Sequence, residues 1–191
     1  MKKTAFKIIH ACLLLGVLTI RTNSAGFQDS ALHSDTNTST WKYFASRSGW
    51  SVKVPPSWKV WSCEDCPDPG APGVFVSFGH PSAMEGMVTI EELSAKPADQ
   101  SVTQWLDHLK TSANLNPVVS TEAILLSGLP ALKVKYGKLS SEIEFESIYV
   151  VNGTTTLMLS FFNQERNVPI EADRNYAAYL QMVRTFNFAK R

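Results

Sequence analysis

Residues 128–163 alternate between apolar and polar side chains with the period of two that is typical of β-strands. Apolar residues alternate with lysines over 132–136 and with glutamates over 142–146. Asn152-Gly153 then separates two further strand-like runs, and this dipeptide favours the tight turn of a β-hairpin because both residues tolerate positive φ. The pattern predicts three antiparallel strands that follow one another along the chain.

A two-residue turn at Asn152-Gly153 also predicts the register of the hairpin. It places Ile148 opposite Leu157 and Tyr149 opposite Thr156. Ile148 and Tyr149 point to opposite faces of the strand, so apolar side chains lie on both faces of the predicted sheet. Such a sheet needs cover on both sides.

Two segments with the apolar periodicity of amphipathic helices can supply that cover. The first begins at Ser101, whose spacing to Gln104 is that of a capping box, and it ends before Pro117. The second follows Pro169 and carries an apolar stripe over 172–183. Further strands are predicted within residues 50–54, 58–61, 73–81 and 86–95. The expected fold class is therefore α+β, an antiparallel sheet covered by helices.

The first 24 residues have the composition of a secretory signal peptide. Lysines precede an apolar run at 11–20, and the small residues Ser24 and Ala25 follow it. The run has about half of the ~20 residues that a transmembrane helix needs, so the chain is not expected to be an integral membrane protein. We expect cleavage near residue 24 or 25 and a periplasmic or secreted product. Lipid attachment at Cys12 is the alternative, and it fits less well because the apolar stretch follows this cysteine.

The remaining chain divides into a linker and one domain. Residues 25–40 are rich in Ser, Thr, Asn and Asp without any period, which predicts a flexible linker. Residues 41–188 have the length of a single domain. Loss of residues 1–24 removes four cations and no acid, so the formal charge falls from +1 to −3. Because no Lys/Arg cluster is left, a nucleic-acid partner is not expected.

Cys63 and Cys66 are the cysteines that remain after the predicted cleavage. In an exported chain such a pair most often forms a disulfide bond. A redox role requires a thiolate at the start of a helix, and the prolines and glycines that follow Cys66 disfavour a helix there. A zinc site requires further ligands, and the available donors are His80, His108, Asp65 and Asp68. No metal or cofactor is predicted, and the thiol and metal alternatives stay open.

The other chemically reactive residues do not form a catalytic motif. Glu142, Glu144 and Glu146 alternate along one strand, which is typical of a solvated or lysine-paired face rather than of acid–base catalysis. His108 is predicted to be solvated, on a different face of its helix from Trp105. The sequence shows no nucleophile–base constellation and no phosphate-binding loop, so we expect the protein not to be an enzyme.

Tryptophan supplies the candidate contact surface. Three tryptophans fall on apolar stripes and are predicted to lie in the core: Trp50, Trp58 and Trp105. Trp61 lies on the polar side of its strand, immediately before a loop rich in proline and glycine. Exposed tryptophan beside a rigid loop is a frequent anchor at interfaces, so Trp61, Asp65 and Pro67 are candidate partner contacts. The alternative is that Trp61 packs under its own loop.

The order of these elements resembles the PsbP-like superfamily. The features that carry the resemblance are GWSVKVPPSW at 49–58, the helix with Trp105 and Leu106, GLPALKVKY at 128–136, the meander, and a C-terminal helix ending in TFNF. The superfamily includes the extrinsic photosystem II subunit, a Ran-binding nuclear-import factor and many exported bacterial proteins. The resemblance covers most of residues 41–188 and implies an α/β/α sandwich, with no catalytic motif to transfer.

These features together favour a non-catalytic binding or assembly module of the bacterial cell envelope, with another envelope protein as its partner. One alternative is a thiol or metal-binding protein that acts through Cys63 and Cys66. The other alternative is a carrier of a small apolar ligand held between sheet and helix.

Overall fold

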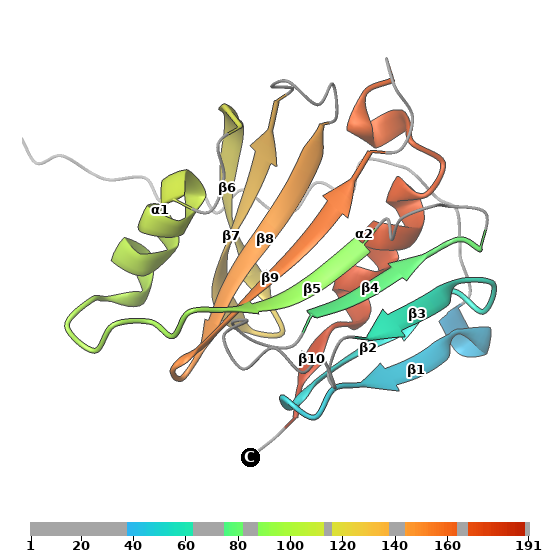
Figure 1. Ribbon diagram of the computed structural model, residues 1–191, viewed down its shortest axis with the longest axis horizontal. Coiled ribbons are helices and arrows are strands. Elements are labelled where there is room, and N and C mark those ends of the chain that lie inside the picture. Colours follow the sequence, from blue (N-terminus) through green and yellow to red (C-terminus); the bar gives the residue numbers. More distant parts are fainter. Residues whose placement is uncertain are drawn as a thin grey trace, which may run out of the picture. The chain divides into compact units, whose positions relative to one another are not determined.

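The computed structural model describes residues 38–62, 75–81, 88–112, 116–137, 144–163 and 168–189. The largest unit of this part is a sheet of seven strands: β3 (Lys59–Ser62), β4 (Phe75–Gly79), β5 (Val88–Leu93), β6 (Val118–Leu126), β7 (Leu129–Tyr136), β8 (Phe145–Asn152) and β9 (Thr155–Phe162). Their order across the sheet is β3-β4-β5-β9-β8-β7-β6, and every neighbouring pair is antiparallel (Figure 1). The predicted antiparallel sheet is confirmed.

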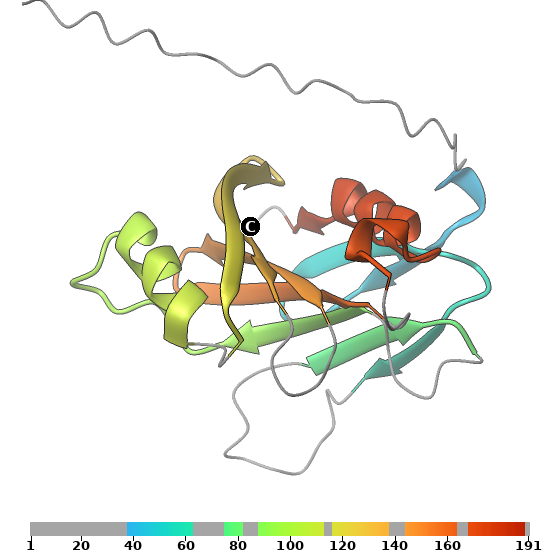
Figure 2. The same cartoon turned by 90° about the horizontal axis from the view of Figure 1, so that it is seen from above.

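A smaller sheet and two helices complete the described part of the domain. The smaller sheet has the order β1-β2-β10. Its strands are β1 (Lys42–Ala45), β2 (Trp50–Val54) and β10 (Asn187–Phe188). The helices are α1 (Val102–Ser112) and α2 (Tyr176–Thr185), and the 3-10 turns are η1 (Thr38–Thr40) and η2 (Ile170–Ala172). Figure 2 shows α1 and α2 well apart, and their core contacts place them on opposite faces of the seven-stranded sheet.

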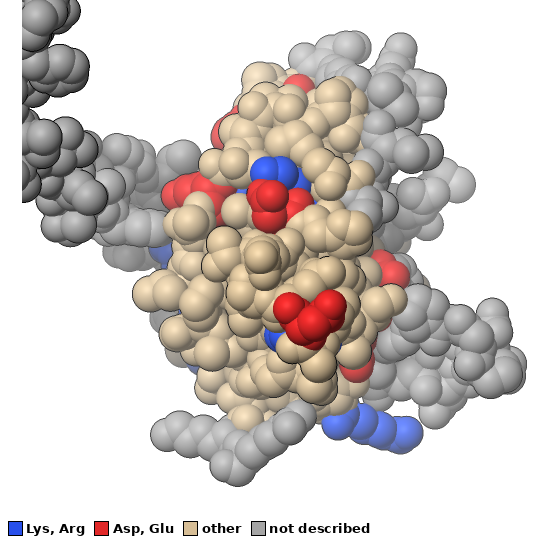
Figure 3. Space-filling model, turned by 90° about the vertical axis from the view of Figure 1, so that its left-hand side faces the viewer, with Lys and Arg blue, Asp and Glu red and all other residues tan. Residues whose placement is uncertain are grey.

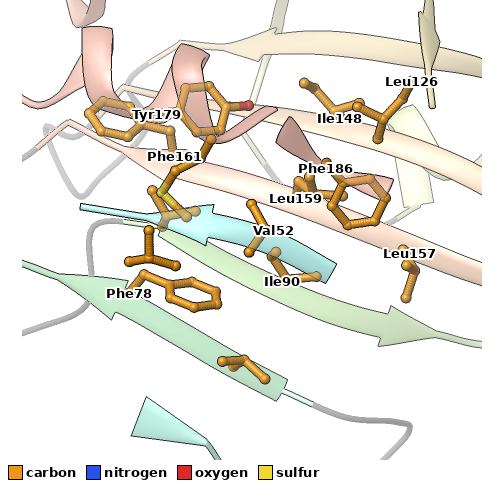
Figure 4. Close-up of a cluster of buried hydrophobic side chains, with 14 of the residues drawn as sticks. Val52, Phe78, Ile90, Leu126, Ile148, Leu157, Leu159, Phe161, Tyr179 and Phe186 are labelled. Carbon is orange, nitrogen blue, oxygen red and sulfur yellow. The ribbon is translucent and has the colours of Figure 1, made fainter. Parts of the chain in front are cut away.

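The two faces of the sheet carry separate hydrophobic cores. On one face Trp105 and Leu109 of α1 pack with Tyr149 of β8. On the other face Tyr179 of α2 stacks on Phe161 of β9, with ring centroids 5.2 Å apart, in a larger core that includes β2 (Figure 4). Successive residues of β8 therefore enter different cores, which confirms the prediction of apolar side chains and helical cover on both faces.

The start of α1 agrees with its predicted capping box. The Ser101 backbone N–H donates to Gln104 Oε1 at 3.0 Å, and the Gln104 N–H donates to Ser101 Oγ at 3.2 Å. These reciprocal bonds satisfy donors that have no partner within the helix.

Seen from the side that carries α1, the described surface has few charged side chains (Figure 3).

The β8–β9 hairpin forms, but its predicted register is wrong. Asn152 pairs with Thr155, so the two turn residues are Gly153 and Thr154, and Ile148 lies opposite Leu159. Gly153 has φ of +65°. Thr154 does not have positive φ, because Ser127 is the one non-glycine residue with positive φ in the described part. A turn in which the first of the two central residues is a glycine with positive φ, and the second is not, is a type II′ turn. The Thr154 carbonyl also accepts a hydrogen bond from Lys96 N at 3.2 Å, a tertiary contact that supports this frame. Because each partner moves by two residues, every side chain keeps its predicted face.

Gly153→Val is expected to destabilise the domain by about 1–2 kcal/mol, the cost of a left-handed conformation for a β-branched residue. A Cβ at Gly153 would meet no other atom within 4 Å, so the backbone alone is responsible for this loss. Thermal and urea unfolding measure the effect. Thr154→Val is the control, because Thr154 does not have positive φ. Equal stability of Gly153→Val and the wild type would contradict the turn assignment.

Three strands and one boundary differ from the sequence prediction. Strands β1, β6 and β10 were not predicted, and β6 occupies the stretch that follows Pro117. The second helix begins at Tyr176 instead of directly after Pro169, because η2 and a short connection come first. The predicted signal peptide and most of the linker lie outside the described residues, although the last three linker residues form η1. Among the described helices, none has the length and apolar character needed to cross a bilayer.

Candidate functional site

Trp61 is the predicted contact residue that the described part of the chain contains. It lies in β3, the strand at one end of the seven-stranded sheet, and is 40 % exposed. Its neighbour Val60 points to the other face of the sheet and is 38 % exposed. Cys63, Asp65, Cys66 and Pro67 lie outside the described residues, so the disulfide and their contact roles stay predictions.

The exposure of Trp61 sets it apart from the three tryptophans that were predicted to lie in the core. Trp50, Trp58 and Trp105 are buried as predicted, and Trp105 Nε1 donates to Thr156 Oγ1 at 2.9 Å. An indole that is two-fifths exposed on an end strand keeps apolar area that folding has not used. No other described strand pairs with the outer edge of β3, so this edge offers backbone groups and the indole ring offers an anchor to a partner.

A row of small hydroxyl side chains crosses the sheet beside Trp61. Trp61 pairs with Ser77 of β4, Ser77 with Thr89 of β5, Thr89 with Ser160 of β9, and Ser160 with Ser147 of β8. The Ser147 and Ser160 hydroxyls lie 2.7 Å apart and share a hydrogen bond. The four hydroxyl residues are buried, so Trp61 is the exposed member of this row.

Glu146 corrects the prediction of a solvated glutamate face. It is 3 % exposed and lies on the α2 side of β8, where the Tyr176 hydroxyl donates to Glu146 Oε2 at 3.0 Å. Burial raises the pKa of Glu146, while Lys133 and the Tyr176 hydrogen bond act in the opposite direction. Tyr179 lies close enough to influence the same carboxyl, yet its hydroxyl and Glu146 Oε1 have no well-aligned hydrogen-bond partner in the described structure. Sequence reasoning missed this residue because α2 comes from a distant part of the chain.

The lysines of β7 pair with acids other than Glu146. Lys135 lies directly opposite Glu146 in the sheet, but its Nζ binds Glu171 Oε1 of η2 at 2.7 Å. Lys133 Nζ binds Glu122 Oε2 of β6 at 2.5 Å. Burial acts to raise the pKa of Glu171, but the hydrogen bond from Lys135, a backbone hydrogen bond and the charges of Lys135 and Lys133 together lower this pKa below its ordinary value. These ion pairs join η2 to β7 and β6 to β7, while the Tyr176 hydrogen bond to Glu146 joins α2 to β8.

The two described histidines, His80 and His108, lie on different parts of the chain. His108 is exposed, but its ring stacks on Trp105 with centroids 5.3 Å apart, which corrects the prediction that it lies on a different helix face. His80 is exposed just after β4. Within the described ranges, no group of three His, Cys, Asp or Glu side chains is placed to hold a metal ion.

Comparison with solved structures identifies the fold. The solution structure of cyanobacterial PsbP (CyanoP) from Synechocystis sp. PCC 6803 matches with a TM-score of 0.50 and 12 % identity, over 77 % of this chain and 91 % of that chain. The fold is PsbP-like. This PsbP-like arrangement confirms the resemblance seen in the sequence, although no protein-family model and no curated protein match the chain.

Two further structures match over most of their length. LpqN of Mycobacterium tuberculosis, a protein involved in cell envelope biogenesis, has a TM-score of 0.45 and 14 % identity, over 74 % of this chain and 83 % of LpqN. A protein of unknown function from Pseudomonas aeruginosa has a TM-score of 0.43 and 11 % identity, over 79 % of this chain and 97 % of that chain. At such identities a PsbP-like fold does not determine function, which has to be argued from the surfaces of this chain.

Proposed function

We propose that this PsbP-like chain is a non-catalytic, exported binding or assembly module of the bacterial cell envelope. The observation that carries the proposal is the exposed Trp61 on the open end of the seven-stranded sheet. Export rests on the predicted signal peptide, with cleavage near residue 24 or 25 and a periplasmic or secreted product.

The β3 edge has the properties of a protein contact. An end strand presents backbone N–H and C=O groups to which an extended partner segment can bond. Trp61 and Val60 add exposed apolar area on both sides of that edge. Tryptophan is enriched among the residues that dominate binding energy at interfaces. The partner expected from these features is another envelope protein that contributes an extended segment and an apolar pocket for the indole.

Site-specific photocross-linking in the native envelope tests this surface. We expect p-benzoyl-phenylalanine at position 61 to give one discrete adduct larger than the chain, because the probe occupies the place of a contacting indole. Position 43 is the matched control, since Tyr43 is also aromatic and is 70 % exposed, but lies on β1 of the smaller sheet. Mass spectrometry of the adduct identifies the partner.

A second variant separates binding from incidental proximity. Val60→Lys, combined with the probe at 61, is expected to reduce the adduct at least fivefold because it places a charge beside the contact. Absence of an adduct from position 61, or equal adducts from positions 61 and 43, would contradict the proposed surface.

A further inference from the structure

The strand at the opposite end of the sheet, β6, pairs with β7 along one edge and with no described strand along the other. Side chains from Val118 to Ala123 are exposed. Leu125 is 73 % exposed and Val119 is 62 % exposed, although both are aliphatic. Strand β6 is also the longest strand of the described structure, with nine residues. A long, apolar end strand is the kind of element that pairs with another chain.

The turn between β6 and β7 determines which backbone groups face this edge. Leu126 pairs with Leu129 across Ser127 and Gly128, whose φ values of +53° and +79° are those of a type I′ turn. In such a hairpin the residues that flank the turn form a hydrogen-bonded pair, and bonded and non-bonded pairs then alternate. Leu125 therefore falls in a non-bonded pair, which fits its partner Pro130, a residue without an N–H.

The same alternation continues along the strand. The N–H and C=O groups of Leu125, Ala123 and Thr121 point away from β7 and toward the open edge. The register shifts between Val118 and Ser120, so the regular part of the edge ends at Ser120. These three residues alternate along the strand, with Ala123 in the middle. Together they offer a regular row of hydrogen-bond donors and acceptors to a second strand.

Features that commonly protect end strands are missing from this regular part. It contains no proline and no lysine. Its one charged residue, Glu122, is already bound by Lys133 of the neighbouring strand. The charge that would otherwise oppose pairing at the edge is therefore largely balanced within each chain.

We propose that this edge binds a second copy of the chain, with β6 antiparallel to its copy about a two-fold axis at Ala123. In this register Ala123 faces Ala123 of the copy, and Thr121 faces Leu125, so all three outward-facing residues of each strand find partners. Glu122 faces Ile124 of the copy, and the two glutamates are not directly opposite. A contact of this kind is self-complementary, as a two-fold dimer requires.

The size of the contact sets the expected strength of the dimer. A single short strand pair buries much less than the about 1,600 Å² of a standard interface, so the association is reversible and depends on concentration. It joins two seven-stranded sheets into one continuous sheet. The β3 edges, at the other ends of the sheets, stay available to a different partner.

Cysteine cross-linking tests the register. In a full-length chain whose three native cysteines are changed to serine, Ala123→Cys is expected to form a disulfide-linked dimer under mild oxidation. The two Cα atoms of a bonded antiparallel pair lie about 5.5 Å apart, within the disulfide range. Thr121→Cys is the matched control, because the two copies of this residue are about 13 Å apart in the proposed register. We expect at least ten times more dimer from Ala123→Cys, and equal or reversed yields would overturn the register.

Sedimentation of the full chain with native cysteines under reducing conditions tests the association itself. The mean mass of the wild type is expected to rise with concentration toward that of two chains. Ala123→Lys is expected to raise the dissociation constant at least tenfold, whereas Tyr43→Lys, at an exposed site on β1, leaves it unchanged. Circular dichroism and melting curves verify that both variants fold. A wild type that stays monomeric, or an Ala123→Lys variant that dimerises as before, would overturn the proposal.

Discussion

Trp50→Ala is expected to lower the free energy of unfolding by about 3–5 kcal/mol, the range for removal of a large buried aromatic side chain. Trp50 is 1 % exposed and stacks on Phe186 with centroids 6.0 Å apart, while Phe44 lies against it at 5.6 Å. Its Nε1 has no hydrogen-bond partner in the described structure, so the loss measures packing and not a broken hydrogen bond. Urea unfolding followed by far-UV circular dichroism gives the value.

Trp61→Ala is the control for this experiment. Trp61 is 40 % exposed on an end strand, so the same substitution is expected to cost about 1 kcal/mol or less. Comparing the two losses in unfolding free energy distinguishes a tryptophan that stabilises the fold from one whose exposed ring can bind a partner. Equal losses for the two variants would show that Trp61 is part of the core and would remove the main support for the proposed function.

Glu146→Gln is expected to change how stability depends on pH. Burial raises the pKa of Glu146 in the folded chain above its value in the unfolded chain. The folded state therefore binds more protons than the unfolded state between these two pKa values, and stability falls as pH rises through that window. Glutamine keeps an oxygen for the Tyr176 hydroxyl but does not titrate. The variant should consequently gain stability relative to the wild type from about pH 4.5 upward, until the folded carboxyl is fully ionised.

Paired unfolding curves at several pH values measure this difference. Groups that titrate alike in both proteins cancel, and the charged neighbours of Glu146 are Lys133 and Glu171. Glu122→Gln is the matched control. Glu122 also has Lys133 as a charged neighbour, but it is an exposed residue on β6. A difference between Glu146→Gln and wild type that is constant with pH would show that the carboxyl is not held in a desolvated site.

Local sequence patterns were sufficient where the deciding contacts lie close together along the chain. The capping box at Ser101 and the positive φ of Gly153 depend on a few neighbouring residues, and both are observed. The predicted position of the β8–β9 turn was wrong by one residue. Asn152 keeps negative φ, and the Thr154 carbonyl accepts a hydrogen bond from Lys96 N. Local turn preference does not contain that second contact, which comes from residues more than fifty positions earlier.

Tertiary contacts explain the remaining differences. Strand β6 was not predicted because an end strand exposed on both faces has no clear apolar–polar alternation. Glu146 was assigned to a solvated face because alternating acids usually lie in water, whereas α2 covers this one. For the candidate site, the sequence placed Trp61 on the Lys59 side of its strand and left open whether it is exposed or packs under its own loop; in the described structure it is 40 % exposed. The open ends of the sheet depend on strand order, which the local pattern does not determine.

The pairing of β10 with β2 has a consequence for the order in which the chain can fold. Phe188 pairs with Trp50, and Ala189 N donates to Gly49 O at 2.8 Å, so the smaller sheet joins residues from the two ends of the domain. On the ribosome, β2 emerges long before β10, so the side of Trp50 that stacks on Phe186 stays uncovered until these late residues have been synthesised. Contacts between such distant residues slow folding. The smaller sheet thus stays incomplete until its last strand has been made, and chaperones can bind its apolar residues during that time.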